Sequence, residues 1–174
     1  MMEKNYIYGI RAVIEAIEAG KNIDKVLLRR DLSGELSKEL MWKIREHGII
    51  TQKVPVEKLN RITMKNHQGA IALLSPVSYQ RLENLVPLFY EEGRNPLVLV
   101  LDGITDTRNF GAIGRTCDCA GVDAIVIPER NSVTVTPDAM KTSAGGLLYV
   151  PVCRERSTFE AVKFLKANGY HIVG

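Results

Sequence analysis

An unbroken run of five aliphatic residues, 97–101 (LVLVL), constrains the fold of this chain more than any other stretch. A strand that is apolar on both faces is expected where helices cover both sides of a parallel sheet. Polar turn residues follow the run, a helical pattern covers about 110–120, and Gly121 stops it before a second apolar strand at 124–127 (AIVI). The run therefore predicts a central strand of a parallel sheet in an α/β fold.

The rest of the second half continues this alternation. Ser157 and Glu160 match a capping box. In this motif a serine side chain caps the helix, and the side chain of a glutamate three residues later bonds back to the N–H of the serine. The helix that follows ends at Gly169, and residues 170–173 (YHIV) are predicted to form another strand. Strand, helix and strand in this order begin a doubly wound sheet, in which ligands bind outside the carboxyl ends of the strands.

The first half also alternates between strands and helices. Apolar periodicity predicts helices at 10–17 and 36–44, a short helix at 55–60, and strands at 25–30, 49–54 and 69–74. We therefore predict a small α/β domain over residues 1–75. Prolines punctuate residues 76–94, which we predict to be a linker carrying one helix, and the second domain covers 95–174.

Composition excludes several classes of protein. The chain has 174 residues, 45% hydrophobic and 25% charged, which is typical of a globular protein. Its longest aliphatic run is far shorter than the roughly 20 residues that a membrane span requires. The amino-terminal residues MMEKNYIYGI lack the apolar core of a secretory signal. Three cysteines cannot build a disulfide framework, so the cytoplasm is the expected location.

Charge is unevenly divided along the chain. Residues 1–80 hold 13 Lys and Arg against 9 Asp and Glu, a net charge of +4, whereas residues 81–174 carry −1. This bias permits a polyanionic partner for the first half. A solvated surface of mixed sign is the more ordinary explanation of such a bias.

A glycine-containing segment follows the aliphatic run. Asn109, Gly111 and Gly114 lie in the first turns of the predicted helix, and Arg115 follows them. Glycines allow a backbone to approach a ligand, a helix amino terminus attracts anions, and arginine can clamp a phosphate. A phosphate-contacting loop and a merely tight strand–helix turn both remain open.

This segment, LDGITDTRNFGAIGRTCDCAGVDAIVIP, resembles the first signature motif of the SpoU/TrmH branch of the SPOUT methyltransferases. The matching positions are Asp102, Gly103, Asp106, Asn109, Gly111, Arg115, Ala120, Gly121 and Pro128. Residues 141–145 (KTSAG) resemble the small-residue turn of the same family. Residues 8–13 (YGIRAV) and 67–72 (HQGAIA) resemble the ends of the substrate-binding domain of bacterial 23S rRNA guanosine-2′-O-methyltransferases.

The resemblance implies a fold and a chemistry. The first domain is expected to be similar to a small ribosomal protein and to bind ribosomal RNA through Arg11, His67 and Gln68. The second domain is expected to be the first part of a knotted SPOUT domain, a homodimer when full length, that moves a methyl group from S-adenosylmethionine to a ribose 2′-hydroxyl.

Arg115 and Asn109 are the catalytic residues that the resemblance implies. Arg115 would act on the 2′-hydroxyl, either as a general base or as an anchor for the adjacent phosphate and the developing alkoxide. A guanidinium group holds its proton in proteins, so the anchor is the physically easier role, although the sequence leaves both open. Asn109 would hold the loop or the arginine in place.

Two further motifs of the family, a glutamate-glycine loop and a serine-leucine-asparagine loop, do not occur in the 174 residues. The resemblance implies that these loops form the cofactor pocket and lie beyond Gly174. We therefore assign no cofactor-binding residues and expect this chain alone to be inactive. Two other functions stay open: a non-catalytic RNA-binding protein, and a phosphate-binding α/β enzyme acting on a small molecule.

Metal binding and nucleophilic catalysis are not predicted. Cys117 and Cys119 lie on opposite faces of the predicted helix, and no histidine has a carboxylate or cysteine at ligand spacing. Ser143 lacks a nearby histidine or aspartate, so a turn or helix-end hydroxyl explains it.

Overall fold

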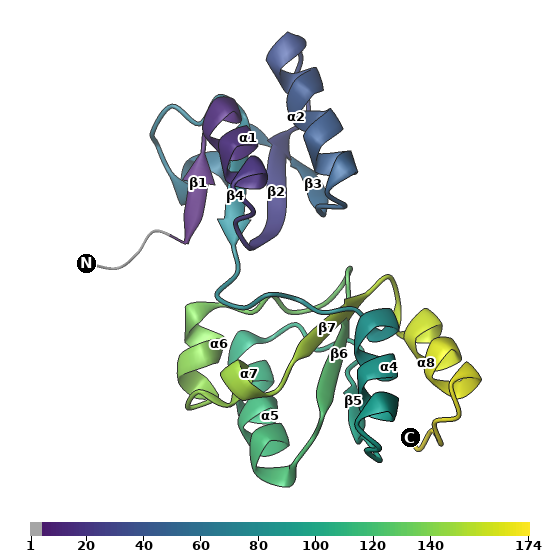
Figure 1. Ribbon diagram of the computed structural model, residues 1–174. Coiled ribbons are helices and arrows are strands. Elements are labelled where there is room, and N and C mark those ends of the chain that lie inside the picture. Colours follow the sequence, from purple (N-terminus) through teal and green to yellow (C-terminus); the bar gives the residue numbers. More distant parts are fainter. Residues whose placement is uncertain (1–4) are drawn as a thin grey trace. The chain divides into compact units, whose positions relative to one another are not determined.

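The computed structural model describes residues 5–174, which divide between Ser75 and Pro76 into two compact units. We call these unit 1 and unit 2. Each unit is an α/β domain with its own sheet and its own hydrophobic core (Figure 1). The predicted α/β class is therefore confirmed.

Unit 1 is built on a four-stranded mixed sheet in the order β1-β4-β2-β3. Its strands are β1 (Tyr6–Tyr8), β2 (Ile23–Arg29), β3 (Thr51–Val54) and β4 (Ala70–Leu74). Strands β2 and β3 are parallel, whereas β4 runs antiparallel to β1 and β2. The carboxyl ends of β1, β2 and β3 and the start of β4 consequently meet at one edge of the sheet.

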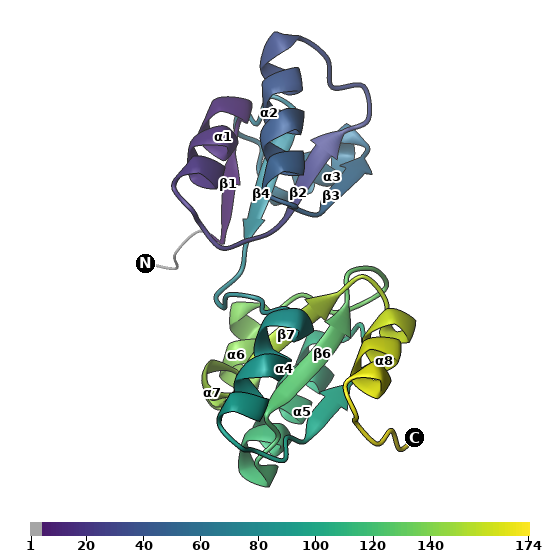
Figure 2. The same cartoon turned by 45° about the vertical axis from the view of Figure 1, so that its right-hand side comes forward.

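Helices cover both faces of this sheet (Figure 2). Helices α1 (Ile10–Glu18) and α2 (Glu35–Glu46) pack on one face, and α3 (Val56–Ile62) packs on the other. Successive residues of β2 alternate between these two layers, since Val26 and Leu28 face α1 and α2 whereas Leu27 faces α3. All three side chains are buried, which explains why residues 26–28 (VLL) form an unbroken apolar run.

Unit 2 contains a parallel three-stranded sheet in the order β5-β6-β7. Its strands are β5 (Val98–Val100), β6 (Ala124–Pro128) and β7 (Val152–Glu155). Helices α4 (Leu82–Glu91) and α8 (Thr158–Ala167) pack on one face; α5 (Thr107–Ala120), α6 (Pro137–Thr142) and α7 (Gly146–Tyr149) pack on the other. Strand β6 is buried throughout.

The position of the first predicted strand differs from expectation. The aliphatic run was predicted to be central, but in the described chain β5 lies at the end of the strand order and β6 holds the centre. Leu97 is excluded from the strand and is 56% exposed. An aliphatic run shows that both faces are covered, yet it carries no information about whether both edges are paired.

Local signals at helix ends are confirmed. Gly121 ends α5 in the left-handed conformation, with φ of 70°. The Ser157 Oγ accepts a hydrogen bond from the Glu160 N–H at 3.1 Å and so caps α8.

The strand predicted at residues 170–173 is not formed. Tyr170 and Ile172 instead pack as irregular chain against the layer of α4 and α8, and the chain stays irregular through Gly174. A strand needs ladder partners, and no strand of residues 5–174 pairs with this stretch. Conversely, β1 and β7 were not predicted, because neither short segment lies within a longer aliphatic run such as the one that contains β5.

The segment predicted as a linker is largely part of unit 2. Its helix, α4, buries Leu82, Val86 and Phe89 against β6 and α8. Gln80 also pairs with β7 through Gln80 N–H to Val152 O (2.9 Å) and Arg154 N–H to Gln80 O (3.0 Å). Val77 and Tyr79 pack against the core on the opposite face of the same sheet.

Candidate RNA-binding edge and catalytic helix

The structure brings the three predicted RNA-binding residues of unit 1 to one edge of its sheet. Gly9 follows β1 and begins α1, which contains Arg11; His67 and Gln68 directly precede β4. Two backbone hydrogen bonds, from Gly9 N–H to Ala70 O (3.0 Å) and from Arg29 N–H to Gly69 O (2.8 Å), tie these loops together. Segments nearly 60 residues apart thus form a single surface.

His67 is buried at this edge, and both of its ring nitrogens have partners within the protein. Nδ1 accepts a hydrogen bond from the Gly69 N–H at 3.0 Å, and Nε2 lies 2.9 Å from Asn60 Oδ1. The first contact requires an unprotonated Nδ1, so Nε2 carries the proton and donates it to Asn60. His67 therefore supports the turn before β4 and presents no free ring nitrogen to a ligand.

Gln68 connects this turn to α1. Its backbone is left-handed, with φ of 52°, and its side-chain Oε1 accepts a hydrogen bond from the Ile10 N–H at 3.1 Å. The N-cap residue of α1 is Gly9, which has no side chain to accept a hydrogen bond from the first turn of the helix. Gln68 therefore supplies a cap from a distant segment while its side chain stays exposed at the edge.

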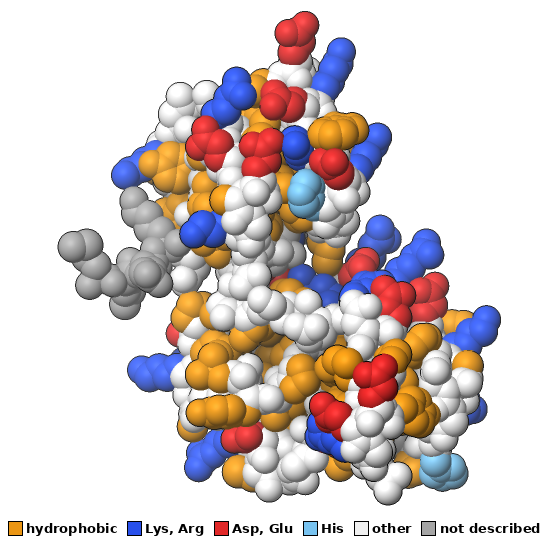
Figure 3. Space-filling model, in the orientation of Figure 1, with side chains coloured by type: hydrophobic (Ala, Val, Ile, Leu, Met, Phe, Trp, Pro, Cys, Tyr) orange, Lys and Arg blue, Asp and Glu red, His pale blue; other side chains and the backbone are white. Residues whose placement is uncertain are grey.

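Arginines supply the positive charge of this edge. Arg11 is exposed and lies 4.0 Å from Glu39, and Arg29 pairs with Asp31 at 2.8 Å. Arg30 is exposed and has no ion pair among residues 5–174. Lys and Arg side chains are spread over the visible face of unit 1 in Figure 3. Exposed, incompletely paired arginines can contact phosphates.

A shallow pocket of about 280 Å³ lies beside Arg29 and Arg30. Its other lining residues are Asp31, Val54, Pro55, Val56 and Glu57. They come from the ends of β2 and β3, so the parallel pairing of these strands creates the pocket. Sequence analysis gave this pocket no signal, because its two walls are about 25 residues apart in the chain.

In unit 2, the two predicted catalytic residues lie on α5. The Asp106 side chain caps this helix by accepting a hydrogen bond from the Asn109 N–H at 2.8 Å. Asn109 and Arg115 both have exposed side chains, and no hydrogen bond joins them in the part of the chain that the structure describes. The helix thus fixes their backbones and leaves both side chains free to meet a ligand.

Arg115 has no ion pair within residues 5–174. Asp102, a carboxylate that could have paired with it, accepts a hydrogen bond from Thr158 Oγ1 at 3.1 Å. A salt bridge that only stabilises the fold therefore does not account for Arg115. Its guanidinium group is an exposed cation in the middle of α5.

The glycines of α5 serve helix packing. A Cβ atom at Gly111 would lie 2.7 Å from Thr142 Cβ, and one at Gly114 would lie 2.6 Å from Leu147 Cδ2. Neither contact is possible for a real side chain, so the two glycines allow α6 and α7 to lie close against α5. Both glycines therefore have a packing role, which neither a phosphate-contacting loop nor a tight strand–helix turn would require.

Residues 141–145 cover the last two residues of α6 and the turn to α7. Ala144 and Gly145 are left-handed, with φ of 51° and 90°. Ser143 is buried; its Oγ donates to Met140 O at 2.8 Å and accepts from the Leu147 N–H at 3.3 Å. This confirms that Ser143 is a helix-end hydroxyl group.

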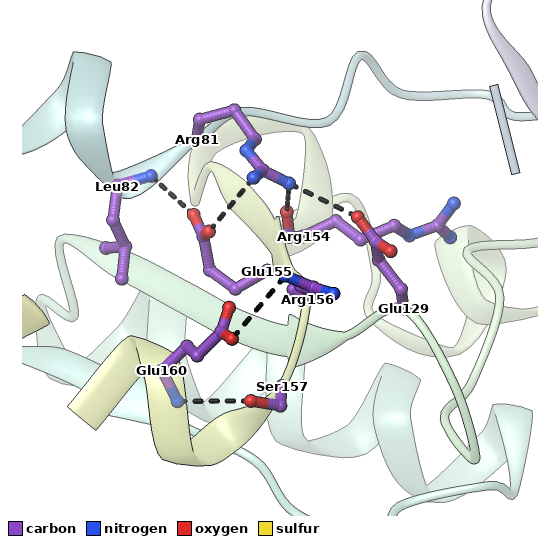
Figure 4. A network of polar contacts seen from close by, with 8 residues as sticks. All are labelled: Arg81, Leu82, Glu129, Arg154, Glu155, Arg156, Ser157 and Glu160. Carbon is purple, nitrogen blue, oxygen red and sulfur yellow. Dashed lines mark hydrogen bonds and ion pairs between the residues drawn. The ribbon is translucent and has the colours of Figure 1, made fainter. Parts of the chain in front are cut away.

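A polar network that sequence analysis missed lies at the carboxyl ends of β6 and β7 (Figure 4). The Arg81 guanidinium donates to Arg154 O at 2.8 Å and lies 3.4 Å from Glu129 and 3.5 Å from Glu155. Glu155 also accepts a hydrogen bond from the Leu82 N–H at 2.7 Å and so caps α4. Arg81 thus pairs with two carboxylates at the carboxyl ends of the strands, which is where ligands of such sheets bind.

The described cysteines show no catalytic arrangement. Cys117 and Cys153 are buried, and burial together with the nearby Glu155 raises the pKa of the Cys153 thiol to about 12. No group of three or more His, Cys, Asp and Glu residues in 5–174 could hold a metal ion. The helices of this same range include none that is long and apolar enough to cross a membrane.

Among the residues described, neither the groove on α5 nor the polar edge of the unit 2 sheet is a fitting site for S-adenosylmethionine. This molecule needs partners for an ammonium and a carboxylate group beside a pocket for adenine. The groove of about 400 Å³ on α5 is lined by Leu99, Ala112, Ile113, Thr116, Cys117, Ala120 and Val122, none of them charged. At the sheet edge, Glu129 and Glu155 are engaged by Arg81. The placement of the family's cofactor loops beyond Gly174 stays a prediction.

Comparison with known families assigns each unit separately. Residues 6–80 match the model described as RNA 2′-O ribose methyltransferase substrate binding, and residues 96–174 match the SpoU rRNA methylase family. A Staphylococcus aureus protein assigned to the TrmH family of tRNA/rRNA methyltransferases is 36% identical over 173 residues, which cover 99% of this chain and 70% of that protein. A Staphylococcus epidermidis protein of the same description is 35% identical over the same coverage.

Two solved structures are also similar. The SpoU methyltransferase AviRb from Streptomyces viridochromogenes, in complex with AdoMet, has 21% identity and a TM-score of 0.44 and covers 94% of this chain. An AdoMet-bound rRNA methyltransferase from Sinorhizobium meliloti has 21% identity and a TM-score of 0.44, with 93% coverage. The chain spans 58% and 57% of the lengths of these two solved chains.

Proposed function

Because the chain belongs to the TrmH family of tRNA/rRNA methyltransferases, and its residues 96–174 match the SpoU rRNA methylase family, we propose that it acts in transferring a methyl group from S-adenosylmethionine to a ribose 2′-hydroxyl group of RNA. Arg115 is the observation in the structure that carries this proposal. It occupies the position of the family's motif arginine, and it is an exposed cation with no ion pair among residues 5–174. In finer detail, we propose that the modified nucleotide is a guanosine of 23S rRNA and that the protein acts in the cytoplasm.

Unit 1 binds the RNA in this proposal. Its sheet edge presents Arg11, Arg29 and Arg30, and the first 80 residues carry a net charge of +4. Gln68 stays in the interface because its side chain is exposed beside the start of α1. His67 contributes by holding the turn that positions Gln68, since its ring nitrogens are already bonded.

Unit 2 supplies the catalytic arginine. A ribose hydroxyl is a poor nucleophile, so its oxygen needs correct placement and stabilisation of the negative charge that develops on it. The Arg115 guanidinium anchors the adjacent phosphate with two parallel donors and stabilises the developing alkoxide electrostatically. Asn109, in the capped first turn of the same helix, orients the nucleotide through its exposed amide.

The methyl donor has no assigned residues in this proposal. Two places in unit 2 do not fit it: the groove on α5 lacks charged groups, and Arg81 engages the carboxylates at the sheet edge. The proposal places the loops that hold the donor beyond Gly174, as the family resemblance implies. Homodimer formation belongs to the proposal as well.

The test uses the natural protein that carries this sequence. The protein is incubated with S-adenosylmethionine labelled on its methyl group and with 23S rRNA transcripts, and the modified nucleotide is then mapped. Label on a guanosine ribose would support the full proposal, and label on another ribose would overturn only its guanosine part. Label on a base would overturn the 2′-hydroxyl, and RNA without any label would overturn the methyl transfer.

A further inference from the structure

Trp42, on the outer face of α2, is the feature of unit 1 that neither its core nor the RNA-binding edge explains. It is the single tryptophan of the chain, and it is 58% exposed. Tryptophan is among the most buried residue types on average, since exposing its large ring to water is unfavourable. The residues of α2 that face the core are Ser37, Leu40 and Ile44, and Trp42 lies on the opposite side of the helix.

The indole ring is braced on one side. The Lys43 Nζ lies 5.0 Å from the ring centroid, a cation–π distance. Lys43 is itself held by Glu18 of α1 at 2.9 Å and by Glu46 at 3.8 Å. The hydrogen bond with Glu18 raises the pKa of Lys43, so the ammonium group stays charged. One side of the ring is therefore held, while more than half of the side chain remains open to solvent.

Two cations without ion pairs flank Trp42 on α2. Lys38, Trp42 and Arg45 follow one another at intervals of four and three residues, so they share a stripe of the helix surface. Lys38 and Arg45 are exposed and have no ion pair among the described residues. Two of the acidic residues on α2 are partly neutralised, since Glu39 lies 4.0 Å from Arg11 and Glu46 contacts Lys43. Glu35, in the first turn, is exposed and has no ion pair among the described residues. Figure 3 shows this mixture of side chains over α2.

This stripe is continuous with the proposed RNA-binding edge. Arg11, at the start of α1, reaches Glu39, which is three residues from Trp42 on α2. Helix α2 starts just after the Arg29–Arg30 end of β2 and rises about 1.5 Å per residue, so Trp42 lies roughly 10 Å from its start. An RNA strand leaving the edge could follow α2 to Trp42.

We infer that Trp42 is a stacking platform for an unpaired RNA base, with Lys38 and Arg45 contacting the phosphates of the same strand. This inference rests on the proposed function, because it assumes that unit 1 binds RNA. An open aromatic face beside unpaired cations is the combination that proteins use for single strands, in which every base offers a flat face for stacking. A purely apolar patch would favour a protein partner, but the flanking cations match a polyanion.

The test follows the fluorescence of the 174-residue chain, to which Trp42 contributes its one tryptophan signal. The probes are an oligoadenylate of about 12 nucleotides and a fully paired RNA duplex of similar length. We expect the oligoadenylate to quench Trp42, and the duplex to bind with little quenching because its bases are already stacked.

Substitutions separate stacking from general charge. We expect Trp42→Ala to lower affinity for the oligoadenylate about 5- to 100-fold, and Trp42→Phe to retain most of it. The double substitution of Lys38 and Arg45 by Ala should reduce the slope of log affinity against log salt by about 1.4. Phe159→Ala removes a similarly exposed aromatic side chain from unit 2 and should change nothing.

Each other outcome overturns the inference in a recognisable way. If the chain binds the oligoadenylate, but without quenching and with equal affinity after Trp42→Ala, the stacking platform is wrong and RNA binding by unit 1 stands. If neither RNA binds at all, both the stacking role of Trp42 and the proposed RNA binding by unit 1 are wrong. If Trp42→Ala changes only the self-association of the chain, the stripe is an interface between copies.

Discussion

Gly114 of α5 lies directly against Leu147 of α7, so closely that a Cβ atom at residue 114 would stand 2.6 Å from Leu147 Cδ2. Both residues are buried. The turn after α6 can return to α5 at this distance only because residue 114 has no side chain. Gly111 and Gly114 thus determine how α6 and α7 pack against the helix that carries Arg115.

Gly114→Ala is therefore expected to destabilise unit 2. Alanine favours helices, but the added methyl group overlaps Leu147, and overpacking of a core costs about 1–3 kcal/mol. Denaturant unfolding followed by circular dichroism measures the change. Leu147→Ala in the same chain should relieve the overlap, so the double variant should lose less stability than the two single changes together. An equally stable Gly114→Ala variant would contradict this packing.

Arg115→Ala in the natural protein is expected to lower single-turnover methyl transfer about 10²–10³-fold while leaving the melting temperature unchanged. The reason is that Arg115 is exposed and makes no ion pair within residues 5–174. Arg115→Lys should recover little activity, because an ammonium group lacks the planar, two-pronged donor geometry. Lys166→Ala on α8 is the matched control, an exposed cation that should leave the rate unchanged. Loss of stability together with activity, with rescue by lysine, would give Arg115 a structural role instead.

His67→Ala is expected to lower the stability of unit 1. The substitution leaves the Gly69 N–H and the Asn60 side chain without their partner, and an unsatisfied buried polar group costs about 1–3 kcal/mol. Thermal and denaturant unfolding of unit 1 would show this loss. A variant of unchanged stability with weakened RNA binding would place His67 in direct contact with RNA.

Arg30→Ala is expected to weaken RNA binding without affecting the fold. Arg30 is exposed at the end of β2 and has no ion pair in the described chain. Losing one phosphate contact should reduce the slope of log affinity against log salt by about 0.7–0.9. Binding measured at several salt concentrations tests this, with Lys166→Ala as the control. An unchanged slope would remove Arg30 from the interface.

The three cysteines should differ in reactivity and in their response to pH. Cys119 is exposed and should react with a thiol reagent in the native protein, whereas Cys117 and Cys153 should react only on unfolding. Burial raises the pKa of Cys153 from 9.0 to about 12. The unfolded chain therefore releases this proton first, so the stability contributed by the neutral thiol is complete below pH 9 and is lost between pH 9 and 12. Cys153→Ala should remove that part of the alkaline dependence; equal labelling of all three native cysteines would contradict the burial.

Signals that act over a few residues could be predicted from the sequence alone. Gly121 ends α5 and Ser157 caps α8, because a left-handed residue and a side-chain cap act within one helical turn. The alternation of strands and helices predicted the α/β class, since apolar periodicity records which faces are buried. The motif from Asp102 to Pro128 placed Asn109 and Arg115 on one helix, where the structure has them.

Only the tertiary structure decided how distant segments meet. Arg81 reaches Glu129 and Glu155, which are 48 and 74 residues away, and Gln68 caps a helix that begins 58 residues earlier. Gly114 takes its role from Leu147, and β6 rather than β5 holds the centre of the described sheet. The physical reason is that periodicity and capping describe a residue's own element, whereas a contact between elements depends on the positions of both in space. No pattern within either segment contains that information.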